Sequence, residues 1–172
     1  MVVGEVITAI TTGPLEIPDV TAPSVLVAAL APTMLKLAGT VADGTATWMT
    51  GIGTIDSHIA PKIRQAAADA GREAPRIVVS LPICLTENPA GARDAIDEMF
   101  SIYPTLPSYK AMLDIEGVTR PSEIGLIGSR EQIIDGIGRL EVAGGTELVA
   151  APSGNRAEQA ATFEFLGELA RS

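Results

Sequence analysis

The sequence predicts an α/β fold in which parallel strands are joined by helices. Runs of β-branched and apolar residues alternate along the chain with segments in which apolar residues recur at helical spacing. Several strand-like runs are almost continuously apolar, as expected of parallel strands that are buried on both faces. Of the 172 residues, 47% are hydrophobic and 19% are charged, a composition that can fill the core of one globular domain.

The periodicity places four core strands and five helices. Strands are predicted at residues 24–30, 45–49, 76–85 and 146–150. The helices are expected to bury, in chain order, Met34, Leu37, Ala38 and Val41; Ile55, Ile59 and Ile63; Ala92, Ile96 and Met99; Ile133, Ile137 and Leu140; and Phe163, Leu166 and Ala170. We expect one domain made of a hairpin lead-in at 1–22, three strand–helix units at 23–100, an insertion at 101–124 and a last unit at 125–172.

Local signals refine these elements. Asn88 is a good N-cap for the third helix, and Ser129 and Gln132 have the spacing of a capping box for the fourth. Pro61 should kink the second helix or move its start, because proline has no backbone donor. Pro82 would disturb a central strand unless it lies near the strand end.

Charge and composition exclude several classes of partner. The chain has 12 Lys and Arg against 21 Asp and Glu, and its net charge of -9 would repel a nucleic-acid backbone. The longest apolar stretch, 25–41, is interrupted by polar residues and is too short for a membrane helix. Cys84 is the single cysteine, so no intrachain disulfide can form and we expect a cytoplasmic protein.

The common catalytic motifs are absent from the sequence, including the P-loop, the zinc-protease helix, the paired-cysteine motif and the nucleophile elbow. His58 is the single histidine and lies in a predicted helix, so we expect a surface or packing role and no catalytic triad. Cys84 lies in a predicted buried strand and is expected to be inert. We predict no metal site.

Two turns join the carboxyl end of a predicted strand to a helix N-terminus, where free N–H groups favour anions. In the turn at 28–33, small residues would let a phosphate approach the main chain, and Thr33 could add a hydroxyl donor. The alternative is that this alanine-rich turn only packs tightly.

The second turn, 50–54, holds two glycines as in a dinucleotide-binding fingerprint, but Asp56 stands where the third glycine should be. An acidic side chain there would compete with a pyrophosphate for the N–H groups. Trp48, just before this turn, could be a core residue or could stack on a flat ring.

Several segments together resemble the C-terminal half of luciferase-like oxidoreductases that use the deazaflavin coenzyme F-420. The resemblance runs from about Gly4 to the end of the chain and rests on AALAP-x-x-LxLAG, ADG, WMTG-x-x-T-x-x-x-HIxP, AGR-x-x-PRIVV and LPSYKAML. It implies a (β/α)8 TIM barrel of which this chain holds strands five to eight. Since a whole barrel needs about 250 residues, the single chain would be incomplete. An open half would expose strand edges, so the resemblance implies a homodimer or pairing with a missing N-terminal half.

The resemblance also implies which residues face the ligands. The coenzyme would be bound by Ala29, Leu30, Ala31, Pro32 and Thr33, and the substrate or coenzyme edge by Trp48, Thr50, Gly51 and Ile52. Relatives often have glycine where this chain has Ala31. Arg156 could reach an anionic substrate, although a solvated helix end is the alternative. The groups that assist hydride transfer come chiefly from the other half of the barrel, so no catalytic residue is assigned.

Three functions follow from the resemblance. The first is hydride transfer between reduced F-420 and a small organic substrate. The second is an FMN-dependent monooxygenase on the same fold. The third is a catalytically silent half barrel that serves in binding or assembly, which the missing half would explain.

Overall fold

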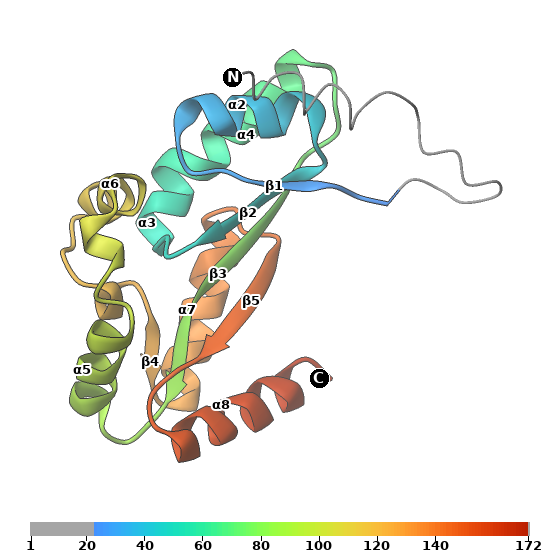
Figure 1. The fold of residues 1–172 in the computed structure, drawn as a ribbon. Coiled ribbons are helices and arrows are strands. Elements are labelled where there is room, and N and C mark those ends of the chain that lie inside the picture. The colour runs from blue at the N-terminus through green and yellow to red at the C-terminus, as the bar shows by residue number, and fades with distance from the viewer. Residues whose placement is uncertain (1–22, 172) are drawn as a thin grey trace, which may run out of the picture.

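A computed structural model describes residues 23–171 and shows one parallel sheet with helices packed against it (Figure 1). The strands are β1 (Leu26–Ala28), β2 (Gly44–Trp48), β3 (Arg76–Leu85), β4 (Leu126–Gly128) and β5 (Glu147–Pro152). All four strand pairings are parallel, which confirms the predicted α/β class. The three-residue β4 was not predicted. The hairpin expected at 1–22 lies outside the described residues.

The helical elements follow the predicted order. They are α2 (Pro32–Val41), α3 (Ile52–Thr54), the π-helical turn η1 (Ile55–Ile59), α4 (Ala60–Asp69), α5 (Pro89–Met99), the short η2 (Tyr103–Thr105), α6 (Pro107–Glu116), the short η3 (Pro121–Glu123), α7 (Arg130–Val142) and α8 (Arg156–Leu169). The predicted caps are confirmed: Asn88 accepts from Gly91 N at the start of α5, and Ser129 and Gln132 form the capping box of α7. No helix in residues 23–171 has the length and apolarity to cross a bilayer.

Strand β3 is the centre of the sheet. It pairs with β2 along its first half, with β4 at its carboxyl end and with β5 on its other edge. The pairing with β2 stops at Ser80 and that with β4 begins at Ile83. Because backbone direction alternates along a strand, Pro82 turns its nitrogen toward the same edge as Arg76 and Thr86, which donate to Asp43 and Gly128 there. Pro82 therefore lies where that edge has no partner, and this position makes a proline compatible with a central strand.

One face of the sheet forms the main core. The odd-numbered residues of β3, from Ile77 to Ile83, are fully buried on this face. Helices cover them with Leu35 of α2, Ile63 of α4, Ile133 of α7 and Phe165 of α8. The predicted buried faces of α4, α5 and α7 are largely confirmed, although Met99 at the end of α5 is exposed.

The predicted buried face of α2 is correct for Ala38 but wrong for its other three residues. Leu35, Ala38 and Gly39 are buried, whereas Met34 and Leu37 are exposed and Val41 is 62% exposed. The neighbouring helix α4 decides this rotation. A Cβ on Gly39 would lie 2.6 Å from the carbonyl oxygen of Ile63, so the two helices meet at the glycine side of α2.

The predicted face of α8 is also wrong in part: Leu166 packs against the core as expected, but Phe163 and Ala170 are exposed. Phe163 is 74% exposed, while Phe165 and Thr162 are buried. The hydroxyl of Thr162 accepts from the backbone N–H of Leu85, 2.8 Å away, at the end of β3. Because a buried backbone donor such as the N–H of Leu85 needs an acceptor, α8 is oriented with Thr162 facing the sheet.

Pro61 lies in the first turn of α4, which begins at Ala60, although the chain is already helical before it. The chain passes from α3 into α4 through η1, in which Ala60 N donates to Ile55 O over five residues. This wider turn precedes Pro61, which has no N–H to contribute to an α-helical ladder. Ile55, Ile59 and Ile63 stay on the buried face as predicted.

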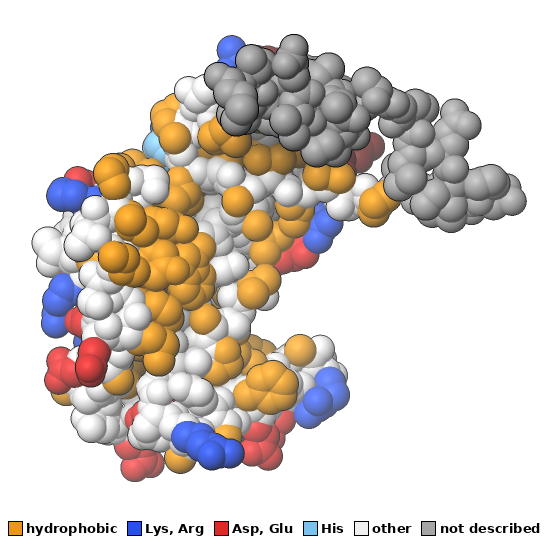
Figure 2. All heavy atoms as spheres, in the orientation of Figure 1, with side chains coloured by type: hydrophobic (Ala, Val, Ile, Leu, Met, Phe, Trp, Pro, Cys, Tyr) orange, Lys and Arg blue, Asp and Glu red, His pale blue; other side chains and the backbone are white. Residues whose placement is uncertain are grey.

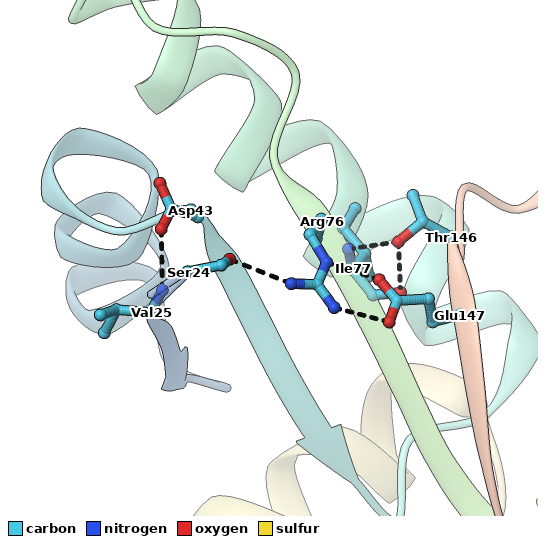
Figure 3. Close-up of polar contacts among 7 residues, drawn as sticks. All are labelled: Ser24, Val25, Asp43, Arg76, Ile77, Thr146 and Glu147. Atoms are coloured by element: carbon cyan, nitrogen blue, oxygen red, sulfur yellow. Dashed lines mark hydrogen bonds and ion pairs between the residues drawn. The ribbon is translucent and has the colours of Figure 1, made fainter. Parts of the chain in front are cut away.

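Polar side chains at the amino ends of four strands, β1, β2, β3 and β5, form a cluster (Figure 3). Arg76 of β3 donates through Nε and Nη2 to both carboxylate oxygens of Glu147 of β5, at 2.6 and 2.7 Å, and through Nη1 to Ser24. This hydrogen bond and charge lower the pKa of Glu147 and raise that of Arg76. Asp43, before β2, accepts from the N–H of Val25, which lowers the pKa of Asp43.

The opposite face of the sheet is more open than the core face. By register, Ser80 of β3 lies beside Val149 of β5, and Val149 is 53% exposed. Ala28 of β1 is also exposed. Exposed apolar residues on a sheet face are typical of a surface that packs against another chain or segment.

We predict opposite effects of two glycine-to-alanine changes within helices. Gly39→Ala should lower the free energy of unfolding by about 1–3 kcal/mol, because its Cβ would push α2 from α4. Gly138→Ala in α7 meets no atom within 4 Å and should raise stability by up to about 1 kcal/mol. Urea unfolding of both variants measures this. A neutral Gly39→Ala would contradict the close packing of the two helices.

Candidate functional site

The first turn predicted to bind a ligand connects β1 to α2 at the carboxyl edge of the sheet. Ala29 is buried in the core, Leu30 is half-buried, and the next three residues, Ala31, Pro32 and Thr33, are exposed. Pro32 occupies the first turn of α2, as expected. The exposed half of this turn is therefore accessible from solvent, and its buried half is fixed by packing.

The N-terminus of α2 has no cap from a side chain. Ala31 occupies the N-cap position and the first turn holds no acidic residue. By contrast, α5, α7 and α8 are capped by Asn88, Ser129 and Asn155. Uncapped N–H groups together with the helix dipole make a helix start attractive to an anion. Among the long helices that follow β1, β3, β4 and β5, α2 alone offers this within the described chain.

His58 forms a hydrogen bond to the turn between β1 and α2. Its Nε2 lies 2.8 Å from the carbonyl oxygen of Leu30, and the side chain is only 8% exposed. A carbonyl only accepts, so Nε2 must carry the proton. The predicted packing role of His58 is confirmed, but its link to the turn was missed. The signal was available, since His58 lies between Ile55 and Ile59 on the buried side of the helix.

A groove of about 700 Å³ begins at this turn and runs between α2 and α4. Its lining includes Pro32 and two exposed lysines, Lys36 of α2 and Lys62 of α4. In a chain of net charge -9, two lysines beside an uncapped helix start add to the attraction for an anionic group.

The second predicted turn already has an acidic occupant. Glu116, the last residue of α6, accepts from the N–H of Gly53 at 2.9 Å through one carboxylate oxygen. Its other oxygen accepts from the N–H and the hydroxyl of Thr54, both at 2.6 Å. The prediction that Asp56 competes for these N–H groups is wrong: the acidic side chain that binds them is Glu116 of α6, and Asp56 is exposed.

The residues predicted to face a ligand in this turn differ in accessibility. Gly51 and Thr50 are buried, Thr50 at 1% exposure, and Ile52 is half-buried. The Thr50 hydroxyl has no hydrogen-bond partner, the one such buried side-chain atom among the described residues. Met49, just before it, has φ of 54°, a conformation that is uncommon outside glycine.

Trp48 ends β2 and belongs to an aromatic cluster with Phe100 at the end of α5 and Tyr103 of η2. Its ring packs edge-on against Phe100 and Tyr103, with centroids 5.5 and 6.1 Å away. Tyr103 in turn contacts Tyr109 of α6 at 4.7 Å. Burial, followed by the neighbouring Tyr103, raises the pKa of Tyr109. Figure 2 shows hydrophobic side chains gathered beside the carboxyl end of β2. Trp48 thus has a packing role, and its stacking on a ligand stays a prediction.

The other two candidate residues, Cys84 and Arg156, lie outside both turns, in β3 and at the start of α8. Cys84 is fully buried, as predicted, and burial, followed by the charge of Glu158, raises the pKa of its thiol to about 11, which favours the protonated form. Arg156 is exposed at the start of α8. The described residues contain no cluster of three metal-ligating side chains.

A comparison with known protein families matches residues 3–147 to luciferase-like monooxygenases. This match covers most of the chain. The chain belongs to the luciferase-like monooxygenase family. No curated protein matches its sequence.

Solved structures of similar fold agree with this family. An F-420-dependent secondary alcohol dehydrogenase, in complex with an F-420–acetone adduct, is 19% identical with a TM-score of 0.59 over 77% of this chain and 44% of that one. The coenzyme F-420-dependent tetrahydromethanopterin reductase from Methanopyrus kandleri is 20% identical with a TM-score of 0.59, over 82% and 48%. A monooxygenase from Streptomyces bottropensis is 18% identical with a TM-score of 0.59, over 85% and 46%. At these identities the likeness is one of fold, and the chain spans about half the length of each.

We predict that His58→Ala lowers the free energy of unfolding by about 1–3 kcal/mol, because the Leu30 carbonyl would lose its buried partner. His58→Gln is the matched control, since the glutamine amide can donate from nearly the same place as Nε2. Chemical denaturation compares the two variants. Equal losses would mean that His58 acts by packing alone.

Proposed function

We propose that this chain is the C-terminal half of a luciferase-like oxidoreductase that transfers hydride between reduced coenzyme F-420 and a small organic substrate. The observation that carries the proposal is the uncapped, acid-free N-terminus of α2 at the carboxyl edge of the sheet. Barrel enzymes bind their ligands at this edge. Two structures of similar fold are named as F-420-dependent enzymes, which favours this coenzyme.

In this proposal the chain binds and orients the coenzyme. Ala31, Pro32 and Thr33 would hold an anionic group through main-chain N–H groups and the Thr33 hydroxyl, with His58 keeping the turn in place. Ala29 and Leu30 complete the turn. When bound, the reduced deazaflavin supplies the hydride.

The second side of the site would be formed at the end of β2. Trp48 and Ile52, both half-buried, would face the ring edge or the substrate. Thr50 and Gly51 lie deeper, so they would shape this wall from behind unless the insertion moves. We assign no catalytic residue to this half, and we place the protein in the cytoplasm.

The strand order supports the half-barrel proposal. In the sheet, β1, β2, β3 and β5 lie side by side in the order in which they occur along the chain, as the fifth to eighth strands of a barrel would. In this proposal β4 is an additional strand beside β3. A half barrel leaves one sheet face and two edges uncovered. We propose that an N-terminal half or a second copy of the chain covers them.

Two alternatives remain distinguishable. An FMN-dependent monooxygenase is favoured by the family description and by the monooxygenase of similar fold. A silent half barrel that serves in assembly is favoured by the open face around Val149.

We predict that the chain binds F-420 saturably, measured by coenzyme fluorescence, with FMN titrated in parallel. Thr33→Glu should abolish binding, because a carboxylate would take the N–H groups of α2, while stabilising the helix by about 0.3–1 kcal/mol. Val41→Glu, at the exposed far end of α2, is the matched control and should bind normally. Binding of FMN alone would favour the monooxygenase, and binding of neither by folded protein would favour the silent half barrel.

We also predict that the purified chain is a dimer or larger, because a solitary half barrel would expose apolar sheet surface to water. Light scattering after gel filtration measures the mass. Addition of a separately expressed N-terminal half, if one is encoded upstream, should replace the self-association. A stable monomer at high concentration would contradict the half-barrel proposal.

A further inference from the structure

We propose that Glu116 is a positioning residue. In this view its carboxylate fastens the insertion to the start of the helix after β2, and so holds the aromatic wall around Trp48 in place. The link to coenzyme binding rests on the function proposed above, whereas the fastening itself can be tested without any ligand.

The first support is the number and kind of bonds that one side chain makes. The carboxylate of Glu116 receives three hydrogen bonds from two consecutive residues, Gly53 and Thr54. Hydrogen bonds to a charged acceptor are stronger than neutral ones. The donors lie 62 and 63 residues away along the chain, so the contact joins two separate segments of the fold.

The second support is the place of Glu116 in its own helix. It is the last residue of α6, and Gly117 ends the helix in the left-handed conformation with φ of 81°. A negative charge at a helix C-terminus is unfavourable for that helix. The contact with α3 gives this charge a favourable place, because there it meets the N–H groups at the start of another helix.

The third support is the space left for the carboxylate. A Cβ on Gly51 would lie 2.3 Å from Cδ of Glu116, and one on Gly53 would lie 3.3 Å from Oε1. Gly51 has φ of -79°, which any residue can adopt, so its backbone alone does not require glycine. The two glycines that resemble a dinucleotide fingerprint thus admit a carboxylate of this same chain.

The fourth support is the fit of Thr54 between the two segments. Thr54 is fully buried, and its single hydroxyl proton can go to Glu116 Oε2 at 2.6 Å or to the carbonyl oxygen of Met112 at 3.1 Å. Both acceptors belong to α6. Thr54 therefore holds the last turn of α6 in register with the helix after β2.

This fastening reaches the proposed site through the aromatic cluster. Tyr109 of α6 contacts Tyr103, and Tyr103 contacts Trp48. If α6 is released from α3, these rings lose the support that keeps them against Trp48. While Glu116 is bound, the N–H groups of Gly53 and Thr54 are not free for a coenzyme phosphate, which leaves the start of α2 as the anion site.

Trp48 gives the test a direct readout, because it is the single tryptophan of the chain. Glu116→Gln presents an amide NH₂ to donors and should lose at least one of the three bonds. We expect a red shift of Trp48 emission and stronger quenching by acrylamide in the coenzyme-free protein. Asp114→Asn is the matched control: it removes one charge from the same helix, where Asp114 only pairs with exposed Lys110, and should leave the emission unchanged.

A second control separates positioning from general stability. Ile133→Val, on the buried face of α7, should lower the melting temperature without moving Trp48 emission. If Glu116→Gln does not fold, Glu116→Asp decides, since it keeps the charge but is one methylene too short, and it should shift the emission in the same direction. A folded Glu116 variant with wild-type emission and quenching would overturn the proposal.

A double variant adds an independent check. Gly51→Ala should destabilise the wild-type chain because its Cβ meets the Glu116 carboxylate, and should cost much less in a Glu116→Ala background. Equal effects in both backgrounds would overturn the fastening role.

The last measurement is F-420 binding by the same variants. Glu116→Gln should weaken F-420 binding several-fold and Asp114→Asn should not. If the wild-type chain binds no F-420, the proposed function fails, while the fluorescence result on the coenzyme-free protein still decides the role of Glu116.

Discussion

The central strand β3 must satisfy backbone groups on both edges over ten residues, and most of the fold serves that need. Three strands pair with it, and side chains complete what strands do not reach: the hydroxyl of Thr146 accepts from Ile77 at its start, and that of Thr162 accepts from Leu85 at its end. Buried backbone groups without partners are costly, so these requirements orient α8 and allow Pro82 only at a gap in the pairing. The helices then cover the face that carries the odd-numbered residues of β3.

A second constraint acts at the carboxyl edge of the sheet: the first backbone N–H groups of each helix that starts there need hydrogen-bond acceptors from outside the helix. Most of the helix starts at this edge are satisfied by the chain itself, through Asn88, Ser129 and Asn155 and through Glu116 of α6. The start of α2 is the exception within the described residues. The candidate anion site is therefore defined by the helix start whose N–H groups no side chain of the described residues caps, and not by a particular side chain at that place.

Sequence reasoning succeeded where the signal was local. Caps such as that of Asn88 and the strand at 76–85 depend on residues close together in the chain, and the structure confirms them. It placed Ala38 of α2 and Leu166 of α8 correctly but the other residues of these two faces wrongly, because several apolar residues at helical spacing offer more than one stripe. Contacts with distant segments chose between them: Gly39 allows α4 to approach, and Thr162 bonds to β3. The role of Glu116 was out of reach for the same reason, since its donors lie in another unit of the chain.

The sequence by itself determined the α/β class, the order of the main strands and helices apart from β4, and the family, and it marked the two turns at which a ligand site was expected. These follow from periodicity and from short motifs, which are properties of neighbouring residues. Only the tertiary structure decided which turn is free. It placed Glu116 on the glycine-rich turn and left the start of α2 uncapped, because hydrogen bonds between segments depend on how the helices pack around β3.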